Sequence, residues 1–258
     1  MARFTNQFSL GLRWLNCGWR LFRRNPWLLT GMGFCAAALF TLLTLIPFVG
    51  GLVIGTIAPI IVASTYLALD TLSRLKSPLP ASLRLAAIKK SPSELLSIFR
   101  DEQRVIPAVV VAIIGIVMTI LANILMLLVA GDAWTSSWSS LSAGSALAVL
   151  MAAALGFIVY VVLALCLIYA MPLAFLRHEP LIPSIGRSLK IGARHLPALL
   201  VPLAALLLPV ALAVIVSLLS IWTAYLLAFT FSIFMLPIVI SGLYCSYRTL
   251  FPLTPTAA

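Results

Sequence analysis

Charged side chains are scarce in this sequence of 258 residues: Asp, Glu, Lys and Arg make up 9%, while 63% of the residues are hydrophobic. A soluble globular domain carries about 25% charged residues. No charged residue occurs in 25–69 or in 195–247, and Asp132 is the only one in 105–176. Each run is too long for one membrane helix of about 20 residues and long enough for two. The composition excludes a soluble domain and predicts membrane spans in pairs.

Ten-residue segments that alternate apolar and polar residues are also absent, so the spans are expected to be helices rather than the strands of a barrel. We predict an all-α membrane protein whose six transmembrane helices form three αα-hairpins within one integral membrane domain, 1–258. The predicted spans are about 27–46, 52–72, 108–129, 146–175, 198–219 and 224–244. The longer links are 73–105 and 176–195, and each is expected to contain a short amphipathic helix.

Basic residues are missing from three alternate links, 47–50, 131–145 and 220–224. Cytoplasmic links of membrane proteins carry an excess of Lys and Arg, so these three links are predicted to lie outside and both termini in the cytoplasm. The net charge of +11 reflects this asymmetry. We therefore expect no nucleic-acid partner.

Paired cysteine motifs are absent, since no C-x-x-C occurs among the four cysteines, Cys17, Cys35, Cys166 and Cys245. Cys17 and Cys245 fall on the predicted cytoplasmic side, where thiols stay reduced, and all four are interpreted as small buried apolar residues. His178 and His195 have no carboxylate or cysteine at ligand spacing, so no metal or cofactor is expected.

Groups that catalysis requires are equally sparse. The sequence contains no Gly-rich phosphate loop and no H-E-x-x-H, so an enzyme is not expected. A coupled transporter usually places carboxylates at mid-membrane. Asp70 lies at the cytoplasmic rim instead, where a pair with Arg74 is expected. We predict a non-enzymatic scaffold or accessory membrane subunit that acts through lipid and helix contacts and fits a membrane-protein partner; the alternative is a passive pathway for a lipid or small solute.

The sequence does contain basic amphipathic segments before each outgoing span. The first has an apolar stripe at helical spacing, which consists of Phe8, Leu12, Leu15, Trp19 and Phe22. Its arginines fall on another face, which is typical of a helix lying in the headgroup plane. The alternative is a helix packed against the protein's own cytoplasmic loops.

Together the three segments predict a cytoplasmic collar that binds anionic lipid of the inner leaflet. Its predicted members are Arg13, Arg20, Arg24, Lys89, Lys90, Arg100, Arg104, Arg187, Lys190 and Arg194. The alternative is that these residues only satisfy the positive-inside rule.

Three residues are predicted to mediate helix packing. Gly51 and Gly55 form a G-x-x-x-G spacing that allows close backbone approach, here expected against the first span rather than in a dimer. Asn123 lies well inside a predicted span, so its amide is expected to hydrogen-bond to another helix.

The return spans repeat a pattern, because each holds an internal proline (Pro59, Pro172, Pro237), and a tyrosine follows seven positions after the first and last of them. The segments GLRWLNCGWRLFRRNPWLL, IPFVGGLVIGTIAPII and LYCSYRTLF resemble a family of uncharacterised proteobacterial inner-membrane proteins. The resemblance implies six spans and a bacterial inner-membrane location. It implies no catalytic residue.

Overall fold

The structure is a computed structural model that describes residues 2–44, 46, 49–74, 93, 102–131, 143–217 and 220–252. In this part of the chain the regular elements are helices, as predicted. They are α1 (Ala2–Arg24), α2 (Pro26–Thr44), α3 (Val49–Arg74), α5 (Glu102–Ala130), α6 (Ala143–Arg177), α7 (Leu181–Arg194), α8 (Leu196–Ser217) and α9 (Ile221–Leu250). Five of them (α2, α3, α5, α6 and α9) are long and apolar enough to cross a membrane.

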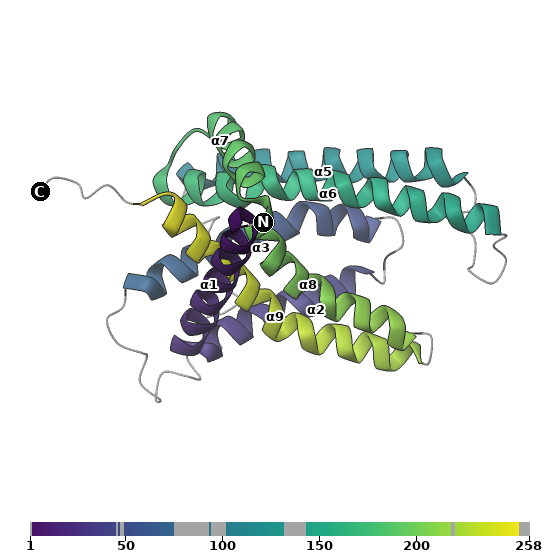
Figure 1. Cartoon of the computed structure of the whole chain (residues 1–258), viewed down its shortest axis with the longest axis horizontal. Coiled ribbons are helices and arrows are strands. Elements are labelled where there is room, and N and C mark those ends of the chain that lie inside the picture. The colour runs from purple at the N-terminus through teal and green to yellow at the C-terminus, as the bar shows by residue number, and fades with distance from the viewer. Residues whose placement is uncertain are drawn as a thin grey trace, which may run out of the picture.

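The apolar helices extend along the long axis of the molecule (Figure 1). The ends of α2, α5 and α8 and the starts of α3, α6 and α9 lie toward one end of this axis. Helices α1 and α7 and the last turns of α9 lie toward the other, which we call the charged end (Figure 1). Helix α9 is central, since it contacts α1, α2, α3, α6 and α8.

Local chemistry explains the boundary between α1 and α2, whereas α5 begins earlier than the predicted span. Asn25 separates α1 from α2, and its Oδ1 accepts a hydrogen bond from the Leu28 N–H at 3.4 Å, while Pro26 occupies the first helical position. The third predicted span was expected at about 108–129, but α5 begins at Glu102 and runs through Pro107. A proline this close to a helix end removes a single hydrogen bond beside an exposed segment, which the helix tolerates.

Helix α6 is one continuous helix of 35 residues. It ends where His178 adopts a left-handed conformation, with φ of 55°, and the N–H of Glu179 donates to the carbonyl of Leu173 at 3.2 Å. This capping turn reverses the chain into α7.

Prolines within the long helices leave carbonyl groups without their usual partner. Pro59, Pro202 and Pro237 have no N–H, so the carbonyl four residues earlier loses its helical hydrogen bond. Each of these carbonyls lies against a glycine of a neighbouring helix: that of Gly55 against Gly115, that of Ala198 against Gly11, and that of Ile233 against Gly33. A side chain at any of these three glycines would collide with the carbonyl oxygen, so the prolines and glycines together define where helices cross.

The proline of α6 is compensated by a side chain instead. Pro172 frees the carbonyl of Ile168, which accepts a hydrogen bond from the Tyr66 hydroxyl at 3.5 Å. Tyr66, Tyr169 and Tyr244 are all fully buried where α3, α6 and α9 meet. Two of these tyrosines, Tyr66 and Tyr244, are the ones that follow a proline by seven positions. Their ring centroids are 6.3 Å apart.

The predicted packing residues have different neighbours from those expected. Gly55 does lie at a close helix approach, but its partner is α5 rather than α2. Gly51 has no atom within 4 Å of the position that a Cβ would take, whereas Gly50 lies against the α2 carbonyl of Leu43. A G-x-x-x-G spacing reports which residues share a helix face and does not specify the facing helix.

Asn123 lies on the exposed side of α5, and its Nδ2 donates to the Thr119 carbonyl of the same helix at 2.8 Å. The expected hydrogen bond to another helix is replaced by this local one. A polar side chain on a helix can reach the carbonyl one turn back, which satisfies its donor without a neighbouring helix.

Candidate functional site

Helix α1 is fixed to the rest of the protein along one side. Gly11 lies against α8, Gly18 lies against Gly242 of α9, and the Trp14 side chain between them is 2% exposed. The two glycines allow the helix backbones to approach closely. Among the described residues, the main packing partners of α1 are thus the apolar helices α8 and α9, and not cytoplasmic loops as in the alternative to the interfacial helix.

A second side of α1 exposes apolar residues. Phe8, Leu12 and Trp19 are 50%, 48% and 45% exposed, although Phe22 of the same predicted stripe is buried. A third side carries Arg13, which is exposed. The helix therefore presents an apolar stripe and a basic face outward while its remaining side is held by the protein.

Two of the predicted collar arginines line a pocket at the charged end, which we call the basic pocket. Its volume is about 530 Å³. Three helices contribute to it, and its lining residues are Cys17, Arg20, Leu21 and Arg24 of α1, Ser73 of α3, and Tyr244, Cys245, Arg248 and Thr249 of α9. No carboxylate is among these described lining residues. Three of the described lining residues are arginines, and the Asp70 carboxylate lies next to this lining, one hydrogen bond from the Tyr244 hydroxyl.

The hydroxyl groups of the basic pocket already use their protons within the protein. Tyr244 donates to Asp70 Oδ1 at 2.8 Å, Ser73 donates to the Asp70 carbonyl at 2.8 Å, and the oxygens of Tyr244 and Ser73 are 3.2 Å apart. Thr249 donates to the carbonyl of Cys245 at 2.8 Å. Each hydroxyl oxygen still has lone pairs with which to accept a hydrogen bond. Asp70 was expected to pair with Arg74, whose side chain lies outside the described residues.

A disulfide joins Cys17 of α1 to Cys245 of α9 on the wall of the basic pocket. The expectation of separate, reduced thiols is wrong for these two residues, whose Cα atoms are 6.2 Å apart despite a sequence separation of 228. Cys35 and Cys166 are free and half-buried. The disulfide ties the arginines of α1 to the helix that carries Arg248.

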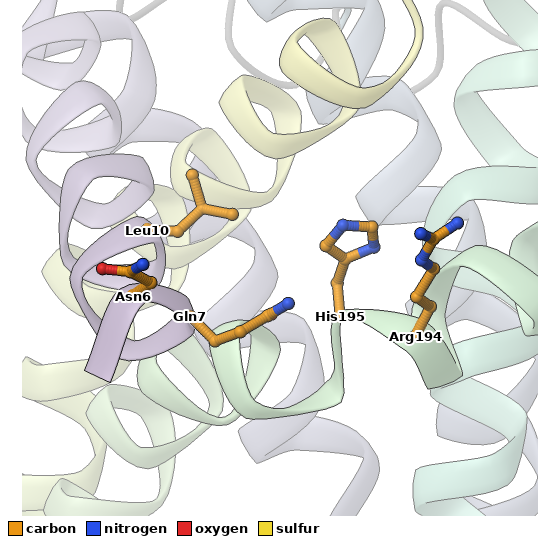
Figure 2. A pocket seen from close by; sticks show the side chains of 5 residues that line it. All are labelled: Asn6, Gln7, Leu10, Arg194 and His195. Atoms are coloured by element: carbon orange, nitrogen blue, oxygen red, sulfur yellow. The ribbon is translucent and has the colours of Figure 1, made fainter. Parts of the chain in front are cut away.

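A second pocket of about 540 Å³ lies near the start of α1, and Figure 2 shows its lining. Asn6, Gln7 and Leu10 of α1 face Arg194 and His195 from the junction of α7 and α8 (Figure 2). The Nδ1 of His195 lies 3.1 Å from the Ile191 carbonyl, which leaves Nε2 as the ring nitrogen without a backbone partner. This junction pocket holds one guanidinium group, against three in the basic pocket.

Among the described residues, the remaining members of the predicted collar do not gather at one site. Arg187 donates to Glu179 at 2.8 Å, Lys190 is exposed, and Arg104 is half-buried in α5. Lys89, Lys90 and Arg100 lie outside the described residues.

Four polar residues of the basic pocket were not predicted from the sequence: Ser73, Tyr244, Arg248 and Thr249. A sequence signal exists for two of them, Tyr244 and Arg248. Tyr244 was noticed only for its spacing from Pro237, and Arg248 follows it by one helical turn, which puts both side chains on the same face of α9.

No family model matches this chain, and no curated protein or solved structure matches it either. Its function is therefore inferred from its own residues.

Proposed function

We propose that this chain is a multi-pass protein of the bacterial inner membrane with six spans in three hairpins and both termini in the cytoplasm. The five long apolar helices support the membrane location, and α8, with 22 uncharged residues, supplies the sixth span. Helices α1 and α7, whose sequences are basic, lie toward one end of the long axis (Figure 1). This supports the orientation, because basic residues accumulate on the cytoplasmic side.

One measurement tests this orientation. A reporter that is active only in the periplasm, fused after Ala258, should stay silent. An active reporter contradicts the cytoplasmic assignment of the charged end.

The proposed activity is that of a non-enzymatic scaffold or accessory subunit that binds anionic phospholipid of the cytoplasmic leaflet. The observation that supports it is the geometry of α1: an exposed apolar stripe (Phe8, Leu12, Trp19) runs beside exposed arginines on a helix whose third side is fixed to α8 and α9. Such a helix places its apolar stripe at the acyl boundary and its arginines among the headgroups. Each basic residue near an anionic leaflet contributes about 1 kcal/mol of attraction.

Lipids that co-purify with the protein in mild detergent test this activity. Changing Arg13, Arg20 and Arg24 together to Gln should deplete phosphatidylglycerol and cardiolipin relative to phosphatidylethanolamine. The matched control changes the same three residues to Lys, which keeps the charge and should retain most of the anionic lipid. An unchanged lipid profile in the Gln variant contradicts the proposal, and a stoichiometric bound solute in place of lipid favours the passive pathway.

A further inference from the structure

We infer that the basic pocket binds the phosphate of one polyhydroxylated headgroup, that of phosphatidylglycerol. This inference rests on the proposed lipid-binding function and assigns it to one site. Arg20 and Arg24 of α1 line the pocket together with Arg248 of α9, which was not part of the predicted collar.

The positive charge of the pocket indicates that its ligand is an anion. Three arginines line one cavity whose described lining contains no carboxylate, and Asp70, which accepts from the lining Tyr244 hydroxyl, offsets at most one of the three charges. Like charges held together repel one another, and a bound anion relieves this repulsion. Guanidinium groups match the oxygens of a phosphate in bidentate geometry, which makes arginine the preferred residue for such recognition.

The backbones that carry the three arginines are held by contacts between α1 and α9. Arg20 and Arg24 are one turn apart on α1, so their side chains share a face. Helix α1 is held against α9 at Gly18 and Gly242 and is linked to it by the disulfide. The site therefore needs little backbone reorganisation before an anion binds, which lowers the cost of binding.

The hydroxyl groups narrow the class of headgroup. Because Ser73, Tyr244 and Thr249 donate their protons to other atoms of the protein, each offers an oxygen that can accept. A glycerol headgroup has hydroxyl donors for these acceptors as well as a phosphate for the arginines. An ethanolamine headgroup also donates, but its ammonium would lie among three guanidinium groups, which repel it.

The size and place of the pocket fit a headgroup. Its volume of about 530 Å³ falls within the range of roughly 300–1,000 Å³ that small-molecule sites occupy. Trp19 is adjacent to Arg20 in the sequence and is 45% exposed, as is common for tryptophan at a membrane surface. A soluble phosphate ester of a polyol would present the same chemistry, so the test must separate the two sources.

The test uses the full-length protein in phosphatidylcholine nanodiscs that contain 20% phosphatidylglycerol, with bound lipid counted by native mass spectrometry. Arg20→Gln with Arg24→Gln should lower the affinity for phosphatidylglycerol roughly 30-fold, about fivefold for each lost charge. Arg248→Gln should lower it about fivefold. The matched control for Arg248→Gln is Arg23→Gln, which removes one exposed charge from α1 outside the described lining of the pocket and should lower the affinity less than twofold.

The outcomes separate this inference from the proposed function. Equal losses in Arg248→Gln and Arg23→Gln overturn the pocket and leave a diffuse basic surface. Failure of the parent protein to enrich phosphatidylglycerol over phosphatidylcholine overturns the proposed function as well. In detergent without added lipid, sn-glycerol 3-phosphate should bind only at millimolar concentration; micromolar binding that the Arg20/Arg24 variant abolishes assigns a soluble ligand and overturns the lipid assignment. Thermal melting of the variants that matches the parent shows that none of these effects arises from misfolding.

Discussion

Helices α1 and α7 share a sequence pattern but differ in the contacts that their side chains make. Both are basic, amphipathic and followed by an apolar helix. Helix α1 approaches α8 and α9 through glycines and places two arginines in a pocket with Arg248. Helix α7 instead buries Leu181, Ser184, Ser188 and Gly192. Its Arg187 is bound to Glu179 at 2.8 Å.

The difference lies in the buried face of each helix rather than in its basic face. Small residues on α1 bring it close enough to α9 for side chains 228 positions apart to share a pocket. On α7, the hydroxyl of Ser188 enters α6, where it donates to the Leu165 carbonyl at 2.7 Å and accepts from the Tyr169 N–H at 3.1 Å. A basic amphipathic pattern thus predicts where a helix lies, while its buried residues decide what the basic face can bind.

The largest difference in stability between variants of α1 and α7 is expected when a glycine is replaced by alanine. In Gly18→Ala the new Cβ would collide with the backbone of Gly242 and Ile238, which can only move if α1 and α9 separate. We expect a loss of about 3 kcal/mol in stability, at the upper end of overpacking effects, and a lower melting temperature in detergent.

The matched control is Gly186→Ala on α7, where no atom lies within 4 Å of the new Cβ. This variant should gain about 0.5–1 kcal/mol because alanine has the higher helix propensity. Equal melting temperatures for the two variants would show that α1 is not packed on α9 as described.

A smaller effect is expected from Ser188→Ala, which removes the hydroxyl that α7 inserts into α6. The Leu165 carbonyl and the Tyr169 N–H lose their shared partner in a buried place, and we expect a loss of about 1 kcal/mol. Ser9→Ala on α1 is the control, since its hydroxyl bonds to the carbonyl of Asn6 at an exposed site. A loss in the Ser9 variant that equals the loss in the Ser188 variant would show that the inserted hydroxyl has no special role.

The smallest effect on stability is expected from Glu179→Gln, which releases Arg187 from its partner. The two side chains are 27% and 59% exposed, and exposed ion pairs contribute at most about 1 kcal/mol, so the melting temperature should change little. The freed arginine should, however, increase the anionic lipid that co-purifies with the protein. Lipid content equal to that of the parent would show that α7 does not contact the anionic leaflet.

Much of the helical layout can be predicted from the sequence, because charge-free runs and apolar spacing are local signals. The short helix before α8 follows from such signals, and Pro107 shows their limit, since a proline near a helix end does not always begin a helix. Periodicity identifies which residues share a face but not which helix they face. For this reason the partner of Gly55 and the local bond of Asn123 could not be foreseen.

The candidate site was predictable only in part, for the same physical reason. Arg20 and Arg24 follow from the amphipathic pattern of α1. The third guanidinium group, Arg248, and the hydroxyl of Ser73 come from two other helices, and only the folded chain brings them to the same pocket. Cys17 and Cys245 share no motif, so their pairing likewise depends on the contact between the first and last helices.

An experimental structure in nanodiscs that contain phosphatidylglycerol tests the central claim most directly. We predict phosphate density in the basic pocket, within hydrogen-bond distance of at least two of the guanidinium groups of Arg20, Arg24 and Arg248. Arg187 should remain paired with Glu179 and should hold no ordered phosphate. A basic pocket that contains only water, with ordered lipid phosphate at α7 instead, would contradict the account.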